Sequence, residues 1–131
     1  MKIPIIIALL LLSTVFFSQS NTDFDNRLLV KFTKAELIEM KKNQPDRLEN
    51  YEYCLDNASY FVDVPKGKDY KHRITKELEI KDVNNYNIYA LDINPLENDY
   101  QYFTVKDKNI LLVLKSFKHI QQQMKADLDN Q

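Results

Sequence analysis

Gly67 is the only glycine in this chain of 131 residues. Glycine normally makes up about 7% of a protein, and it supplies the positive-φ turns and close backbone approach that phosphate-binding loops require. Loops of the GxxxxGK[ST] and GxGxxG types each need two or more glycines. The sequence therefore excludes nucleotide-binding and dinucleotide-binding folds that depend on such loops.

The first 20 residues have the layout of a secretory signal peptide. Lys2 precedes an apolar run over residues 3–17, and small residues follow at Ser18 and Ser20. This spacing favours cleavage after Ser20, with cleavage after Ser18 as the alternative. The run is shorter than the about 20 apolar residues of a membrane span. We therefore expect an exported protein, periplasmic or extracellular, with no stable membrane insertion after cleavage.

Residues 21–131 are expected to form a single small domain. Removing 20 of the 131 residues leaves 111, which is an ordinary domain size. The whole chain carries 18 basic and 19 acidic residues, so its net charge gives no attraction to nucleic acid. Cys54 is the only cysteine, and one cysteine cannot form an internal disulfide. The core must therefore be stabilised by packing alone.

Two helices are predicted near the start of this domain. Thr33 and Glu36 form a capping-box pattern, in which each side chain satisfies the backbone amide of the other residue. Pro45 interrupts that helix and can open the next one, because the first helical residue needs no amide hydrogen. Apolar side chains then recur at three- and four-residue spacing, at Leu48, Tyr51, Leu55 and Ala58.

The remaining segments are predicted to form a sheet and one more helix. Residues 59–64 and 88–93 are rich in β-branched and aromatic side chains, and residues 70–80 alternate like a half-buried antiparallel strand. Residues 100–105 and 110–115 flank a short polar turn and indicate a hairpin. Consecutive strands with short turns favour an antiparallel meander of four to five strands.

Ser116 can cap a final helix whose apolar residues share one face. These residues are Phe117, Ile120, Met124 and Leu128. The amphipathic pattern predicts that this helix packs on one face of the sheet. The fold class is therefore α+β, with an N-terminal helix pair, an antiparallel meander and a C-terminal covering helix.

Cys54 is the one candidate nucleophile of the thiol type. A catalytic thiol needs a base to remove its proton, and the histidines are His72 and His119. Lys71 and Arg73 flank His72 and favour its neutral form, which can act as a base. A thiol-dependent enzyme that uses Cys54 and His72 is thus one hypothesis. The alternatives are a thiol packed at a helix edge and an intermolecular disulfide.

No metal or cofactor site is predicted. One cysteine and two histidines far apart in the sequence form none of the close ligand pairs of structural zinc motifs. Residues 23–26, with the sequence DFDN, alternate oxygen ligands as a calcium loop does, but they lack its glycine and its closing glutamate. We expect this segment to be solvated.

A basic stretch with an interleaved aromatic is a candidate site for an anionic partner. It comprises Lys66, Lys68, Tyr70, Lys71 and Arg73. Nearby acidic residues dilute its field, which makes a solvated hairpin tip the competing interpretation.

Four tyrosines in or beside the expected strands form the second candidate surface. They are Tyr86, Tyr89, Tyr100 and Tyr102. On an open sheet face they would make a flat aromatic surface suited to contact with a protein or a glycan. Packing pairs across neighbouring strands are the alternative.

Three stretches together carry a resemblance to known sequences. They are FFSQS, KFTKAELIEMKKNQPD, and the strand series from EIKDVNNYNIYALDI to NILLVL. The chain resembles small uncharacterised signal-peptide-bearing proteins of Flavobacteria-like (Bacteroidetes) bacteria. The resemblance implies export across an inner membrane, and it assigns no activity and no functional residue. The function that we expect is a non-enzymatic binding or interaction module for a protein or a glycan.

Overall fold

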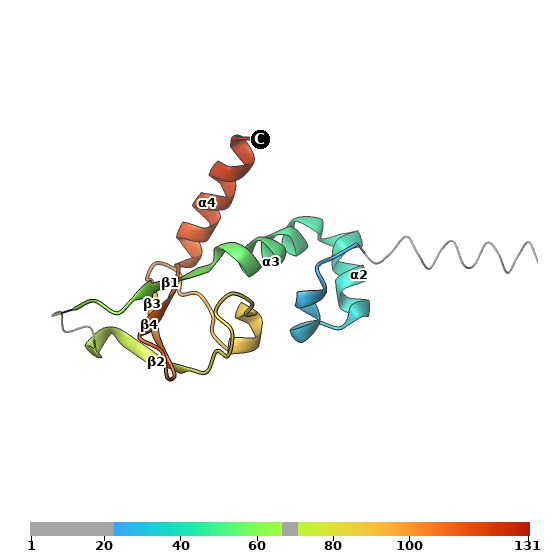
Figure 1. Ribbon diagram of the computed structural model, residues 1–131. Coiled ribbons are helices and arrows are strands. Elements are labelled where there is room, and N and C mark those ends of the chain that lie inside the picture. The colour runs from blue at the N-terminus through green and yellow to red at the C-terminus, as the bar shows by residue number, and fades with distance from the viewer. Residues whose placement is uncertain (1–22, 67–70) are drawn as a thin grey trace, which may run out of the picture.

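The computed structural model describes residues 23–66 and 71–131. Within these residues the chain forms an α+β fold with three α-helices and a four-stranded sheet, as Figure 1 shows. The elements, in chain order, are η1 (Asn26–Val30), α2 (Lys34–Asn43), α3 (Pro45–Asn57), β1 (Ser59–Asp63), η2 (Lys71–Arg73), β2 (Ile74–Leu78), η3 (Ile88–Leu91), β3 (Gln101–Val105), β4 (Ile110–Leu114) and α4 (Phe117–Asp129). The predicted signal peptide and its cleavage sites lie outside the described residues.

The N-terminal helix pair is confirmed, together with the local signals that predicted it. The Glu36 amide donates to the Thr33 hydroxyl at 3.2 Å, and the Thr33 amide donates to the Glu36 carboxylate at 2.7 Å. Pro45 is the first residue of α3. Leu48 and Leu55 on α3 are buried. Helical spacing therefore identified the face of α3 that packs.

The prediction of an antiparallel meander is wrong, because the sheet is mixed. Its strand order is β1-β4-β3-β2, with β2 parallel to β3 and the other two pairs antiparallel. Parallel neighbours cannot be joined by a tight turn, and they need a crossover of a dozen or more residues. Residues 79–100 supply that crossover between β2 and β3.

The segment 88–93 causes this difference, since it is not the strand that its composition predicted. It forms the short 3-10 helix η3, where the Asn87 side chain accepts from the Tyr89 amide at 3.0 Å. Asp92 ends the helix in the left-handed conformation, with φ of 52°. Ile88 and Ile93 are both buried, whereas residues five apart in a strand point to opposite faces. Both isoleucines can enter one core only because the backbone is coiled.

The strand expected over residues 70–80 is also shorter than predicted. The segment before it forms η2 (Lys71–Arg73), and β2 covers only Ile74–Leu78. Leu78 and Ile80 are buried as the alternation indicated. The pairing of β2 is parallel and irregular between Ile74 and Lys76, so the predicted antiparallel strand is corrected in both length and direction.

The C-terminal helix begins where Ser116 predicted, but it does not cover the sheet. The Ser116 hydroxyl accepts from the His119 amide at 3.2 Å. Along α4 only Ile120 is buried, and Figure 1 shows the helix leaning away from the sheet. The sheet face on that side is already covered by the buried residues Ala58, Ile88 and Ile93. Farther along α4, Asp127 accepts a hydrogen bond from Tyr53 of α3 at 2.5 Å.

Two hydrophobic clusters hold the fold, and Tyr89 packs against both. One cluster lies on the sheet around Phe103, Leu112 and Leu114. The other joins η1, α2 and α3, and contains Leu28 and Leu37 among its buried residues. Tyr89 of η3 packs against each cluster, and its hydroxyl donates to the Tyr51 carbonyl at 2.9 Å. The connection between β2 and β3 thus ties the sheet to the helix pair.

The segment 23–26 was expected to be solvated, but part of it is held against the fold. Arg27 of η1 donates to the Asp25 carboxylate at 2.8 Å and to the Asp56 carboxylate of α3 at 2.7 Å. The Asp25 amide donates to Glu52 at 3.0 Å. The charged hydrogen bonds from Arg27 lower the pKa values of Asp25 and Asp56.

We expect the substitution Arg27→Gln to destabilise the fold by about 1 kcal/mol at pH 7, a modest cost because the pairs are partly exposed. Folded-state pKa values below the unfolded value of about 3.9 give stability that is present above pH 4 and lost as pH falls. The difference between variant and wild type should therefore shrink below pH 4. Urea unfolding between pH 3 and pH 7 measures it.

The matched control for this prediction is Lys41→Gln. Lys41 pairs with Asp23, whose side chain is 98% exposed, at 3.2 Å. We expect this substitution to leave the urea midpoint unchanged. A penalty for Arg27→Gln that is equal at pH 3 and pH 7 would contradict the ion-pair explanation and indicate a packing role for the side chain.

Candidate functional site

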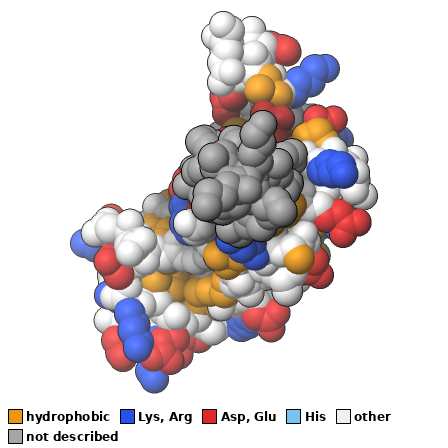
Figure 2. Space-filling model, turned by 90° about the vertical axis from the view of Figure 1, so that its right-hand side faces the viewer, with side chains coloured by type: hydrophobic (Ala, Val, Ile, Leu, Met, Phe, Trp, Pro, Cys, Tyr) orange, Lys and Arg blue, Asp and Glu red, His pale blue; other side chains and the backbone are white. Residues whose placement is uncertain are grey.

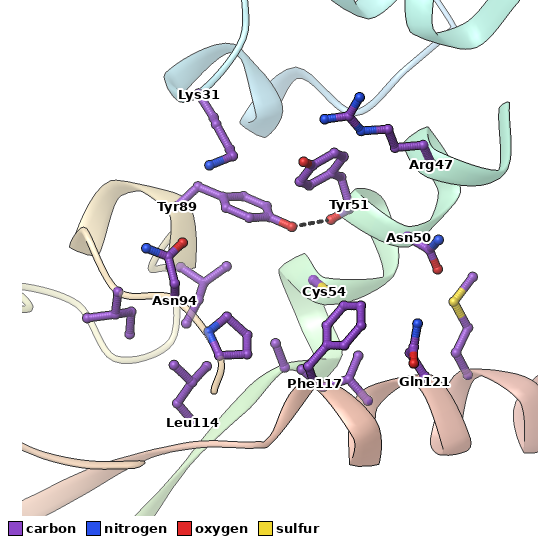
Figure 3. Close-up of a pocket in the computed structure, with 16 residues that line it drawn as sticks. Lys31, Arg47, Asn50, Tyr51, Cys54, Tyr89, Asn94, Leu114, Phe117 and Gln121 are labelled. Carbon is purple, nitrogen blue, oxygen red and sulfur yellow. Dashed lines mark hydrogen bonds between the residues drawn. The ribbon is translucent and has the colours of Figure 1, made fainter. Parts of the chain in front are cut away.

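A pocket of about 320 Å³ opens between α3, η3 and the start of α4. Its volume lies at the lower end of the range of small-molecule sites, which is about 300–1,000 Å³. Figure 3 shows that η3 and the loop after it line one side, with α3 and α4 on the others. The site thus lies where the crossover between β2 and β3 meets the helices.

The interior of the pocket is apolar. Its floor is made by buried side chains of the sheet cluster, namely Ala58, Ile88, Ile93, Leu114 and Ile120. Its walls include half-buried or exposed aromatic and sulfur-containing side chains, namely Tyr51, Cys54, Tyr89, Phe117 and Met124. This combination of aliphatic floor and aromatic wall suits an apolar guest.

Cys54 lines this pocket from the last turn of α3, as Figure 3 shows. Burial raises the pKa of its thiol, and the neighbouring Tyr89 side chain offsets only part of that shift. A raised pKa keeps the thiol protonated at neutral pH, which is the opposite of what an activated nucleophile requires. The site therefore favours a neutral, packed sulfur.

His72 is not among the residues that line the pocket with Cys54. It is exposed in η2, ahead of the edge strand β2. Figure 1 shows η2 on the far side of the sheet from α3. His119 is also absent from the pocket lining and packs edge-on against the Tyr100 ring at 5.5 Å.

The alkylation of Cys54 should follow this environment. With iodoacetamide, we expect an apparent thiol pKa above that of the same cysteine in the urea-unfolded chain, which is about 8.5. The reaction below pH 8 should also be slow. Mass spectrometry of the labelled fraction from pH 6 to pH 10 measures the profile, and an apparent pKa below 8 would show an activated thiolate.

Polar side chains are confined to the rim of the pocket. They are Lys31, Arg47, Asn50, Asn94 and Gln121, all of them exposed. Figure 3 places Lys31 and Arg47 at one end, above the Tyr89–Tyr51 pair, and Leu114 and Phe117 at the other. The pocket therefore has a cationic end and an apolar end.

The predicted anion site in the basic stretch lies only partly within the described residues. Lys66, Lys71 and Arg73 are exposed. Lys68 and Tyr70 lie outside the described residues, so their part in the predicted anion site stays a prediction. Figure 2 shows the right-hand side of Figure 1, away from this stretch, where acidic and basic side chains are interspersed around an apolar patch.

The four candidate tyrosines separate into two groups. Tyr102 shares its sheet face with Tyr60, since both pair with Val113 of β4. Tyr100 is close to both tyrosines, and its pKa is raised by burial first and by these neighbours second. All three are at least partly exposed, which makes a small aromatic surface that includes Tyr60, a residue that was not among the candidates.

Tyr86 and Tyr89 lie on the other side of the sheet. Tyr86 packs edge-on against Phe61 with ring centroids 5.0 Å apart, and its hydroxyl shares a hydrogen bond of 2.7 Å with the Ser59 hydroxyl. Of the four candidates, Tyr89 alone is among the residues that line the pocket. Tyr86, Tyr100 and Tyr102 are not.

Sequence reasoning identified Cys54 and Tyr89 separately but did not identify the pocket. Its lining runs from Lys31 of the N-terminal region to Met124 of α4, and no local spacing connects such distant positions. The available signal was the helical stripe of α3, which places Tyr51 beside Cys54. This stripe was interpreted as a surface that only packs against other elements. In the structure, Tyr51, Cys54 and Ala58 also line the pocket.

Among residues 23–66 and 71–131, no helix is long and apolar enough to cross a membrane. In the same part of the chain, no group of three or more His, Cys, Asp or Glu side chains is arranged to hold a metal ion. Comparisons of the chain with protein-family models, curated proteins and solved structures found no match.

Proposed function

We propose that this protein is an exported, non-enzymatic binding protein whose pocket takes a small apolar ligand. The observation that carries the proposal is the pocket itself, about 320 Å³ with a buried aliphatic floor and with its charged and amide side chains all at exposed positions. An apolar cavity of about 150 Å³ is enough to bind benzene. A pocket of twice that size can hold a bicyclic ring or a chain of about ten carbons.

The non-enzymatic part of the proposal is supported by the state of Cys54. Its thiol has a raised pKa, and no histidine is among the residues that line the pocket. Acid–base chemistry at a thiol needs such a partner within hydrogen-bond reach. Export rests on the signal-peptide pattern of residues 1–20.

The proposal is tested with N-phenyl-1-naphthylamine, an uncharged dye that fluoresces in apolar surroundings. We expect saturable binding of one dye per chain to the protein lacking residues 1–20, and displacement of the dye by 1-decanol. The urea-unfolded chain serves as the control. Fluorescence that rises without saturation, or that 1-decanol cannot compete away, would rule out a defined apolar site.

A further inference from the structure

The two ends of the pocket differ in charge, and this difference can select a ligand. Lys31 Nζ lies 5.7 Å from the centroid of the Tyr89 ring, and Arg47 Cζ lies 5.8 Å from that of Tyr51. The two rings are themselves 5.9 Å apart, edge to face. Two cations from distant parts of the chain therefore flank one aromatic pair at the same end of the pocket, as Figure 3 shows.

Within the part of the chain that the structure describes, neither of these two cations has a carboxylate partner. The ion pairs found in residues 23–66 and 71–131 involve Arg27 and Lys41. Arg47 donates to the Gln44 side chain at 3.1 Å, a neutral acceptor. In a chain with more acidic than basic residues, such a pair leaves room for an external anion.

The pocket also contains no acidic side chain that would oppose an anion. Its lining includes two cations and neither aspartate nor glutamate. The acidic residues Glu49 and Glu52 of α3 line a different hollow, beside Tyr53 and the end of α4. Asp46 and Glu49 line a neighbouring hollow that shares Asn50 with the pocket. Glu36 and Glu39 line another that shares Arg47. The acidic side chains near the pocket thus lie outside its lining.

We propose that the pocket selects a small monoanionic amphiphile, with one apolar chain or ring in the cavity and its carboxylate between Lys31 and Arg47. This inference rests on the proposed function, to which it adds the chemical class of the ligand. The volume of about 320 Å³ matches a single chain of about ten carbons, given the about 150 Å³ that suffice for benzene. A lipid with two long chains is too large for this volume, which favours a ligand with a single chain.

The test displaces the bound dye with three ligands that share one chain, namely decanoate, 1-decanol and decylammonium. We expect decanoate to displace the dye at roughly tenfold lower concentration than 1-decanol, because a charge-assisted hydrogen bond adds to its affinity. Decylammonium should be the weakest of the three, because the two cations repel its charge. In the double variant Lys31→Gln, Arg47→Gln, decanoate should lose this advantage, so that decanoate and 1-decanol displace the dye at equal concentrations.

The matched control is Lys34→Gln with Lys42→Gln. It removes the same charge from α2, from two exposed residues outside the pocket lining, and it should keep the preference for decanoate. Equal potency of decanoate and 1-decanol, or a preference that survives in the pocket variant, would overturn the inference and leave the proposed function standing. If the wild-type protein binds neither the dye nor 1-decanol, the proposed function itself is refuted.

A last arm separates a free acid from a lipid surface. The protein is sedimented with phosphatidylglycerol vesicles and with phosphatidylcholine vesicles. We expect it to stay in the supernatant with both. Sedimentation with phosphatidylglycerol alone that is lost in the double variant would reassign the two cations to lipid headgroups and overturn the assignment to a free acid.

Discussion

Replacing Phe103 with alanine should remove about 3–5 kcal/mol of stability, the cost of deleting a buried aromatic side chain. Phe103 is 1% exposed at the centre of β3, opposite Leu112, and belongs to the cluster that links the sheet to η3 and α4. A domain of this size has a total stability of about 5–15 kcal/mol. With a single cysteine, the chain has no internal disulfide to offset the loss, so the variant should be near its unfolding limit at 37 °C.

Tyr60→Ala is the control, since it removes a ring of similar size from the opposite face of the sheet. Tyr60 is 41% exposed, and Lys115 Nζ lies 5.8 Å from the centroid of its ring. We expect a cost of about 1 kcal/mol or less. Urea unfolding followed by circular dichroism gives both values. Equal costs for the two variants would contradict the assignment of the core to the face that carries Phe103.

Filling the pocket should have the largest effect on binding. In Cys54→Phe a ring projects from the last turn of α3 into the cavity, and it should displace a comparable volume of ligand. The loss of about three buried methylene groups corresponds to about 2–3 kcal/mol, so the apparent dissociation constant of the dye should rise roughly 30- to 150-fold. The cavity can accept the ring, which limits the cost in stability to about 1–3 kcal/mol.

Cys54→Ala is the matched variant at the same position. It keeps the pocket open and removes the thiol, so we expect dye affinity within about threefold of the wild type, since only a small apolar contact is lost. The pair separates occupancy of the cavity from chemistry at sulfur. A dissociation constant unchanged in Cys54→Phe would place the dye elsewhere on the protein.

The parts of the fold that sequence could predict are those set by neighbouring residues. The capping box of Thr33 and Glu36, the cap at Ser116, and the hairpin of β3 and β4 all involve residues close in the chain. Each is specified by hydrogen bonds or turns within a few positions. These predictions needed no knowledge of the tertiary structure.

The parts that sequence could not predict depend on distant contacts. The stretch Ile88–Leu91 has strand-like composition, yet Asn87 caps it as a 3-10 helix, and the Asn87 amide group donates to the Arg27 carbonyl at 2.8 Å. A contact between residues 27 and 87 has no local signature. Once this segment is not a strand, the antiparallel meander fails and β2 pairs in parallel with β3.

The candidate site follows the same rule. Cys54 and Tyr89 could be singled out as residue types, but the pocket depends on η3 lying against α3, which pattern alone does not reveal. The pairing of Lys31 with Arg47 at one end arises in the same way. Their positions 16 residues apart, on either side of α2, gave no reason to consider them together.

The most direct measurement of the central claim is the protection of Cys54 from alkylation by a bound ligand. Because Cys54 is the only cysteine and lines the pocket, its reaction with iodoacetamide reports on this cavity alone. We predict that saturating decanoate slows the labelling at pH 8.5 at least tenfold, and that unfolding in urea abolishes this protection. If decanoate binds and the labelling rate stays the same, the ligand lies outside the pocket and the account is wrong.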